Sequence, residues 1–186
     1  MITVRKFIAR LTSRPPISWH VELISLFAAE LNPGTYAEIG IYEGETFNRV
    51  KAPHKIAVDI VESALGFIPQ QEGVHKILGD ARVFEEYLKM NQIQVDLLFI
   101  DADHAASSVV QDFSVCEKYM SDQGVILLHD TFPGTEAFSS PAFCGDAYKA
   151  IPILREKFPH WTFVTLPIHP GLTIATKIAC LPTWVS

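Results

Sequence analysis

The segment that indicates the fold most clearly is residues 36–46, Tyr-Ala-Glu-Ile-Gly-Ile-Tyr-Glu-Gly-Glu-Thr. A short apolar run leads into Gly40 and Gly44, and residues that favour a helix follow. This order predicts a strand, a tight turn and a helix, with Gly40 able to take a positive φ and let a ligand approach the backbone. Asp59 ends a second predicted strand about twenty residues after the turn, where an acid can reach ribose hydroxyls.

The turn after the first predicted strand lacks the three-glycine pattern of a dinucleotide-binding site. Ile41 stands where the second glycine would be, and Glu43 brings a negative charge close to the place of a pyrophosphate. The turn therefore favours a nucleoside ligand without phosphates over a dinucleotide. A turn of purely structural importance is the alternative, because many α/β proteins contain an isolated glycine turn.

The composition is that of one globular domain, with 186 residues, 48% of them hydrophobic, and a net charge of −6. No apolar run approaches the roughly 18 residues of a membrane span, and no secretory signal is recognisable. A general nucleic-acid surface is not expected, because the chain has only one modest basic group, Arg5, Lys6, Arg10 and Arg14. Reduced thiols in a cytoplasmic protein are expected from three widely spaced cysteines, Cys116, Cys144 and Cys180.

Strand and helix patterns alternate along the chain. Helices are predicted over 17–31, 82–90, 105–120 and 146–157 and just after the glycine turn, with an irregular crossover at 60–73 and a long loop at 132–145. The predicted strands are 36–39, 55–58, 74–78, 95–100, 125–128, 161–166 and 172–177. Only a loop separates the last two strands, so they should form a hairpin with one strand antiparallel to the rest.

The predicted fold class is α/β, a three-layer α/β/α sandwich with a seven-stranded, mostly parallel sheet and an antiparallel last strand. We expect a single domain over residues 1–186, with an N-terminal helical segment at 1–34 and a ligand-binding core at 35–177.

Acids stand at the carboxyl ends of five predicted strands. Because the carboxyl ends of parallel strands meet at one edge of a sheet, these side chains should share one site. Each acid alone could instead cap the helix that follows it. Five at the same edge favour a common ligand site, and they are Glu38, Asp59, Asp80, Asp101 and Asp130, the last preceded by His129.

Taken in order, these motifs resemble those of class I S-adenosylmethionine-dependent methyltransferases. The motifs are Glu-Ile-Gly-Ile-Tyr-Glu-Gly-Glu-Thr, Val-Asp-Ile, Gly-Asp-Ala, Phe-Ile-Asp-Ala-Asp-His and Gly-Val-Ile-Leu-Leu-His-Asp-Thr. The last two are similar in particular to small O-methyltransferases of the rhamnosyl O-methyltransferase/cephalosporin hydroxylase and catechol O-methyltransferase-like families. The resemblance covers residues 35–177 and implies a Rossmann-like fold and methylation of a small hydroxylated molecule.

The resemblance implies a site for S-adenosylmethionine. The turn from Glu38 to Gly44 would hold the methionine part, Asp59 would accept hydrogen bonds from both ribose hydroxyls, and Asp80 would accept one from the adenine amino group. Asp101 would face the cofactor amine or a metal. The cofactor-binding residues implied in this way are Glu38, Gly40, Tyr42, Gly44, Thr46, Asp59, Ile60, Asp80, Ala81 and Asp101.

A hydroxyl acceptor must lose its proton, either with the help of a divalent metal or to a histidine. Metal-dependent relatives in the resembled group have acids at the positions of Asp101 and Asp130, which implies a magnesium site, although Thr131 replaces a further acid or amide ligand. Without a metal, His104 is the expected base, and a surface position is its alternative. The implied catalytic residues are Asp101, His104, His129 and Asp130.

Other residues of this edge have plain structural interpretations. We expect His129 to be buried and hydrogen-bonded, Asp103 to favour the start of a helix, and His169 to be exposed. Trp19 and Phe27 are predicted core residues, and the helix that carries them could instead cover the acceptor pocket.

Two other functions stay open at this point. One is an NAD-dependent oxidoreductase on the same fold, and the other is a nucleoside-cofactor-binding protein without catalysis. The expected partner is a small-molecule acceptor, not a nucleic acid or a membrane, and homodimer formation is left open. The loop at 132–145 and the N-terminal segment should select the acceptor, and neither contains a motif that identifies it.

Overall fold

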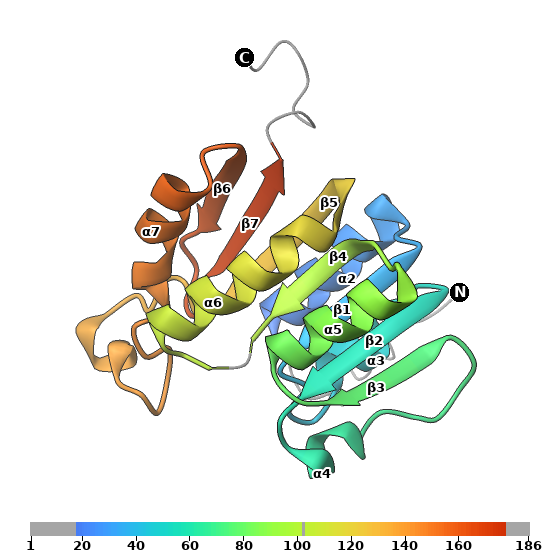
Figure 1. Ribbon diagram of the computed structural model, residues 1–186. Helices are drawn as coiled ribbons and strands as arrows, with labels where there is room; N and C mark the ends of the chain where they lie inside the picture. The colour runs from blue at the N-terminus through green and yellow to red at the C-terminus, as the bar shows by residue number, and fades with distance from the viewer. Residues whose placement is uncertain (1–17, 102, 178–186) are drawn as a thin grey trace, which may run out of the picture.

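Figure 1 shows the computed structural model, which describes residues 18–101 and 103–177. The strands are β1 (Thr35–Ile39), β2 (His54–Asp59), β3 (Val74–Leu78), β4 (Val95–Ile100), β5 (Met120–His129), β6 (Trp161–Leu166) and β7 (Leu172–Lys177). The α-helices are α2 (Trp19–Leu31), α3 (Glu45–Arg49), α4 (Glu62–Leu65), α5 (Ala81–Asn91), α6 (Ala106–Cys116) and α7 (Ala150–Lys157). Three 3₁₀ turns are η1 (Glu117–Tyr119), η2 (Glu136–Ser139) and η3 (Ala147–Lys149).

The predictions for the basic group from Arg5 to Arg14, for Cys180 and for the first 17 residues of the N-terminal segment lie outside the described residues. Within the described ranges, no helix is both long enough and apolar enough to cross a membrane.

All seven strands form one sheet in the order β3-β2-β1-β4-β5-β7-β6 (Figure 1). The pairs among β1 to β5 are parallel, whereas β7 runs antiparallel to both β5 and β6. The hairpin prediction is therefore confirmed, because β6 and β7 pair from Trp161↔Lys177 to Leu166↔Leu172. The pairing also inserts β7 between β5 and β6, an order that the sequence pattern does not specify.

Two apolar clusters cover the two faces of the sheet and make the three predicted layers. β4 supplies both, with Leu98 and Ile100 in one cluster and Leu97 and Phe99 in the other. The first cluster includes residues of α5, α6 and α7, and the second includes residues of α2, α3 and α4. A strand covered on both faces has no polar side to show water, which explains why the β4 sequence is almost wholly apolar.

Helix α2 turns a different face to the core from the one we predicted. Its buried residues are Val21, Ile24 and Ala28. Trp19 is only partly buried against the second cluster, and Phe27 lies outside both clusters, so the core prediction for Phe27 is wrong. The apolar residues of this helix surround much of its circumference, and helical spacing alone does not fix how such a helix is rotated.

The segment between α6 and β5 also differs from the prediction. The helix ends at Cys116 rather than near residue 120, and β5 begins at Met120 instead of Val125. The residues predicted as a turn bulge between the paired positions Val95↔Met120 and Leu97↔Val125. Polar residues and a glycine indicated a turn here, but the strand partner on β4 keeps the backbone extended.

The long loop at residues 132–145 is confirmed, with η2 as its only regular element among the described residues. The ring of Phe138 stacks on His169 of the β6–β7 turn, with centroids 4.1 Å apart. At the end of the loop, the Asp146 N–H donates to the His104 carbonyl at 3.0 Å. Gly145 makes this approach possible, because a Cβ there would lie 2.3 Å from the same carbonyl oxygen. The loop is thus fixed to the carboxyl edge of the sheet.

Candidate active site

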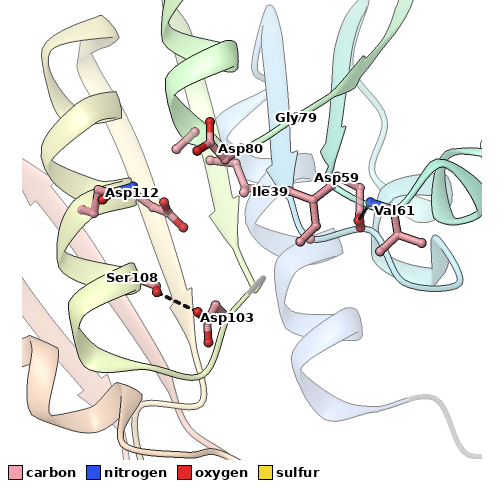
Figure 2. A pocket seen from close by; sticks show the side chains of 12 residues that line it. Ile39, Asp59, Val61, Gly79, Asp80, Asp103, Ser108 and Asp112 are labelled. Atoms are coloured by element: carbon pink, nitrogen blue, oxygen red, sulfur yellow. Dashed lines mark hydrogen bonds between the residues drawn. The ribbon is translucent and has the colours of Figure 1, made fainter.

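A cavity of about 370 Å³ opens where β1, β2 and β3 end (Figure 2). Its floor comes from the strand ends and the turns that follow them, and α6 closes the opposite side. The lining combines apolar side chains with four carboxylates and consists of Ile39, Gly40, Asp59, Ile60, Val61, Gly79, Asp80, Ala81, Asp103, Ser108, Gln111 and Asp112. Gly40 has a φ of 90°, as the sequence predicted for a turn that a ligand approaches.

Asp59 is held at the end of β2 by two backbone groups. Its Oδ2 accepts from the Ile41 N–H at 2.7 Å, and its Oδ1 accepts from the Val61 N–H at 2.8 Å. These bonds fix the carboxylate between the first turn and the second. Each oxygen of an ionised carboxylate has two acceptor positions, so both can also accept from a ligand in the cavity.

Asp80 caps helix α5 and lines the same cavity. Its Oδ1 accepts from the N–H groups of Arg82 at 3.0 Å and Val83 at 3.2 Å. The capping interpretation of this acid is therefore correct, and the binding interpretation survives beside it, because Oδ2 has no hydrogen-bond partner among the residues described. Asp103, at the start of α6, likewise accepts from the Ala105 N–H and from the Ser108 hydroxyl, as predicted for a helix-start acid.

Two further cavities continue from the first along the sheet edge. A cavity of about 390 Å³ shares Gly40, Asp59 and Val61 with it and adds Tyr42 and Asp101. Tyr42 and Asp101 also line a third cavity, of about 510 Å³. The third cavity is completed by the strand ends, the long loop and the β6–β7 turn, through His104, His129, Asp130, Ala142, Phe143, Cys144, His169 and Pro170.

The third cavity contains four ionisable groups in mutual contact. His129 Nδ1 lies 2.9 Å from Asp101 Oδ1 and 3.4 Å from Asp130 Oδ2. His104 Nε2 lies 3.1 Å from the same oxygen of Asp130. The structure thus brings together all four predicted catalytic residues, from β4, β5 and the turn before α6. His104 is partly exposed to the cavity, whereas Asp130 is buried.

Charge balance explains the protonation of this cluster. Burial would lower the pKa of His129, but attraction to Asp101 and hydrogen bonds to both carboxylates outweigh it and raise the pKa to about 10. Burial would raise the pKa of Asp130, but its hydrogen bond to His129 and the charges of His129 and His104 lower it. At neutral pH the site therefore holds a buried imidazolium between two carboxylates.

His20 joins this cluster from helix α2, and no sequence pattern singled it out. Its ring centroid lies 4.2 Å from that of His129. Burial, together with repulsion from His129, lowers the pKa of His20 to about 4. Within the described residues, His20 Nδ1 and His129 Nε2 are buried atoms without a hydrogen-bond partner. Helix α2 thus places a histidine ring against the cluster, and coverage of an acceptor pocket by this helix stays a prediction.

Glu38 is placed differently from the other strand-end acids. It is 2% exposed, accepts a hydrogen bond from the Tyr36 hydroxyl and lines none of the cavities. Burial raises its pKa to about 8, so the carboxyl is protonated at neutral pH. Gly44 and Thr46 also lie outside the cavity linings, since Gly44 begins α3 with a φ of 71° and Thr46 is buried.

A divalent cation would find suitable donors at one point of the cluster. One ligand atom each from Asp101, His104 and Asp130 lie within 4.8 Å of one another. Carboxylate and imidazole ligands suit several divalent metals. Thr131, the position of the missing ligand, is buried, and its hydroxyl accepts from Thr173 at 2.8 Å. His104 therefore lies beside the two predicted ligands, Asp101 and Asp130, and Thr131 does not belong to this group.

Parallel strands with an acid-lined cavity at their carboxyl ends define the Rossmann-like class of α/β proteins. The chain belongs to the family described as a methyltransferase domain, whose model matches residues 37–131. No curated protein sequence matches the chain significantly.

Solved structures show the same fold. A putative caffeoyl-CoA O-methyltransferase from Staphylococcus aureus superimposes with a TM-score of 0.69 and 20% identity, over 94% of this chain and 90% of the other. An O-methyltransferase from Bacillus cereus, solved with S-adenosylhomocysteine, superimposes with a TM-score of 0.69 and 13% identity, over 92% of this chain and 86% of the other. The O-methyltransferase involved in tomaymycin synthesis in Streptomyces achromogenes was solved with S-adenosylmethionine. It superimposes with a TM-score of 0.65 and 16% identity, over 90% of this chain and 85% of the other.

Proposed function

We propose that this methyltransferase domain transfers the methyl group of S-adenosylmethionine to a hydroxyl oxygen of a small acceptor. The observation that carries the proposal is the continuous row of cavities at the sheet edge. One end offers carboxylates fixed by backbone N–H groups, and the other offers a histidine–carboxylate cluster. The similar folds of O-methyltransferases solved with S-adenosylmethionine or its product support the proposal.

The first cavity suits the adenosine part of this methyl donor. Asp59 offers two fixed oxygens to the two ribose hydroxyls, and the free oxygen of Asp80 can accept from the adenine amino group. The second cavity, between Tyr42 and Asp101, would take the methionine part. The many carboxylates of the first cavity would repel a pyrophosphate, which favours this donor over NAD.

The donor supplies a methyl group on a positively charged sulfur. The protein has to hold an acceptor oxygen in line with that group, and positioning of this kind is a large part of catalysis. Asp101 and Tyr42 line both the second and the third cavity, so they mark the place where donor and acceptor would meet. The acceptor would therefore lie in the third cavity, below the long loop.

His104 is our proposed base for the acceptor hydroxyl. Its Nε2 contacts Asp130, which can stabilise the positive charge that develops when the ring takes a proton. Asp101, His104 and Asp130 fit a divalent cation as well, and such an ion would lower the pKa of the hydroxyl. Both carboxylates already contact the His129 imidazolium, so we expect weak metal binding.

Calorimetry and label transfer together test this function. S-adenosylhomocysteine should bind the protein, and NAD⁺ should not, under the same conditions. Transfer of labelled methyl from S-adenosylmethionine to one member of a panel of small phenols, catechols and sugars should then identify the acceptor class. NAD⁺ binding without S-adenosylhomocysteine binding would favour the oxidoreductase alternative. Cofactor binding with no turnover on any acceptor would favour a protein without catalysis.

We further propose a cytoplasmic location and a small-molecule partner. Cys116 and Cys144 are free, buried thiols in the described part of the chain, as expected in a reducing compartment. Homodimer formation stays a prediction.

A further inference from the structure

Asp112 is an acid of the first cavity to which the proposed chemistry gives no role. It lies in α6 and is 8% exposed. Figure 2 shows it on the wall opposite Asp59, beside the cavity that it lines together with Asp80 and Asp103. The helix turns this residue toward the cavity and the sheet, in a row with the core residues Val109 and Phe113.

The carboxylate of Asp112 has no partner in the part of the chain that the structure describes. Among the described residues, no N–H or O–H group donates a hydrogen bond to it, although Asp80 and Asp103 both have such donors. Burial and the nearby charges of Asp80 and Asp103 raise its pKa to about 6. A buried acid without a partner costs stability, and an apolar residue would fill this helix position better. The position is explained if a ligand supplies the missing donor.

The surroundings indicate what kind of ligand group would do so. Asp80 faces Asp112 across the cavity and has one carboxylate oxygen free. Arg82 of α5 is exposed, donates to the Gln111 side chain at 3.1 Å and does not line the cavity. Two acceptors that face one another match a neutral amino group, which has two N–H donors on one nitrogen.

We propose that Asp112 is a second acceptor for the exocyclic amino group of the cofactor's adenine, so that Asp80 and Asp112 together select a 6-aminopurine over a 6-oxopurine. This inference rests on the proposed S-adenosylmethionine function. Each N–H of the amino group would donate to one carboxyl group. A 6-oxopurine would direct carbonyl lone pairs at the same two acids, and unpaired acceptors opposite acceptors are strongly disfavoured.

The test is calorimetric binding of S-adenosylhomocysteine and of its 6-oxo analogue, S-inosylhomocysteine, to the intact protein and three variants. Asp112→Ala should weaken S-adenosylhomocysteine binding about 10-fold or more, whereas binding of the 6-oxo analogue should weaken less or improve. Asp112→Asn keeps a carbonyl acceptor and should stay within about 3-fold of the wild type. Glu86→Ala removes an exposed carboxylate of α5 outside the cavity and should change neither affinity.

A variant that is only partly folded can still be tested, because its unfolded fraction lowers the apparent affinity for both ligands by the same factor. The ratio of the two affinities therefore does not depend on the folded fraction. An unchanged preference for the 6-amino ligand in Asp112→Ala would overturn the inference while leaving the proposed function intact. Absence of S-adenosylhomocysteine binding by the wild type would overturn the proposed function and, with it, this inference. Thermal unfolding should show that Asp112→Asn is at least as stable as the wild type without ligand.

Discussion

The two ends of the row of cavities hold their carboxylates in opposite ways. In the first cavity, backbone N–H groups fix Asp59 and Asp80. The donors come from the turns after β1 and β2 for Asp59 and from the start of α5 for Asp80. In the third cavity, Asp101 and Asp130 are held by histidine side chains. A backbone N–H group is neutral, so it holds a carboxylate in place without adding a charge to the site. Histidine donors add positive charge and provide a group that can move a proton.

This difference assigns the two ends to different tasks. The first end keeps an excess of negative charge and fixed acceptors, which suits recognition of hydroxyl and amino groups. At the third cavity, the His129 imidazolium offsets one of the two carboxylate charges, and His104 lies against the other carboxylate, an arrangement that suits proton removal. Glu38, the strand-end acid that lines neither cavity, is buried beside Tyr36 in β1 and is protonated at neutral pH. Four substitutions test whether the two ends differ in this way.

The largest effect is expected at the acceptor end. His104→Ala should lower the rate of methyl transfer by roughly 10²–10⁴-fold, because it removes the proposed base, and should leave S-adenosylhomocysteine affinity unchanged. Single-turnover label transfer to the acceptor found in the panel measures the rate. His160→Ala, at an exposed histidine bonded to Glu117, is the control.

A chelator separates the two routes for the acceptor proton. Activity that disappears in excess chelator and returns with magnesium would assign proton removal to a metal held by Asp101, His104 and Asp130. Full activity in chelator with a collapse in His104→Ala would eliminate the metal route.

The second effect concerns Glu38 between the two ends. Its folded-state pKa of about 8 lies above its ordinary value of 4.5, so folding takes up a proton between these pH values. The free energy of unfolding should therefore fall as pH rises from about 5 to 8. Glu38→Gln keeps an acceptor for the Tyr36 hydroxyl and should be more stable than the wild type at pH 8, by up to about 3 kcal/mol.

Urea unfolding of both proteins at pH 5 and pH 8 measures this effect. The difference between the two proteins isolates Glu38 from His20 and His129, which also titrate with folding. Parallel stability curves for the wild type and Glu38→Gln would show that Glu38 is not the titrating group.

The third effect is at the adenosine end. Asp59→Ala should weaken S-adenosylhomocysteine binding by about 1–3 kcal/mol, because it removes charge-assisted hydrogen bonds to the ribose. It also removes the hydrogen bonds by which Asp59 connects the N–H groups of Ile41 and Val61. Calorimetry measures it, with the exposed Glu62→Ala as the control. Unchanged affinity in Asp59→Ala would remove the ribose assignment.

The smallest effect concerns the wall of the third cavity. Phe138→Ala removes the stacking on His169 that fixes the long loop, a contact of about 0.5–1.5 kcal/mol. The acceptor KM should rise a few-fold, and S-adenosylhomocysteine affinity should not change. Ile153→Ala, at an exposed position of α7, is the matched control. A loss of cofactor affinity in Phe138→Ala would show that the two ends are not independent.

The sequence by itself determined the sheet and the row of acids along its edge. Strand periodicity and the turn residues around Gly40 are local signals, and they specified the seven strands and the final hairpin. Parallel strands end on the same side, so the positions of Asp59, Asp80, Asp101 and Asp130 in the sequence were enough to place them at one edge. The order of the strands in the sequence therefore predicted that these four acids share one edge of the sheet.

The packing of the helices on the sheet determines which helical side chains face into the site. It also determines which strand-end acid points away from it. His20 reaches His129 because of the rotation of α2, and Asp112 reaches the first cavity because of the position of α6. Glu38 points under α2 and α3 beside Tyr36 instead of into a cavity. Helix rotation is set by packing of side chains far apart in the sequence, which no local pattern encodes.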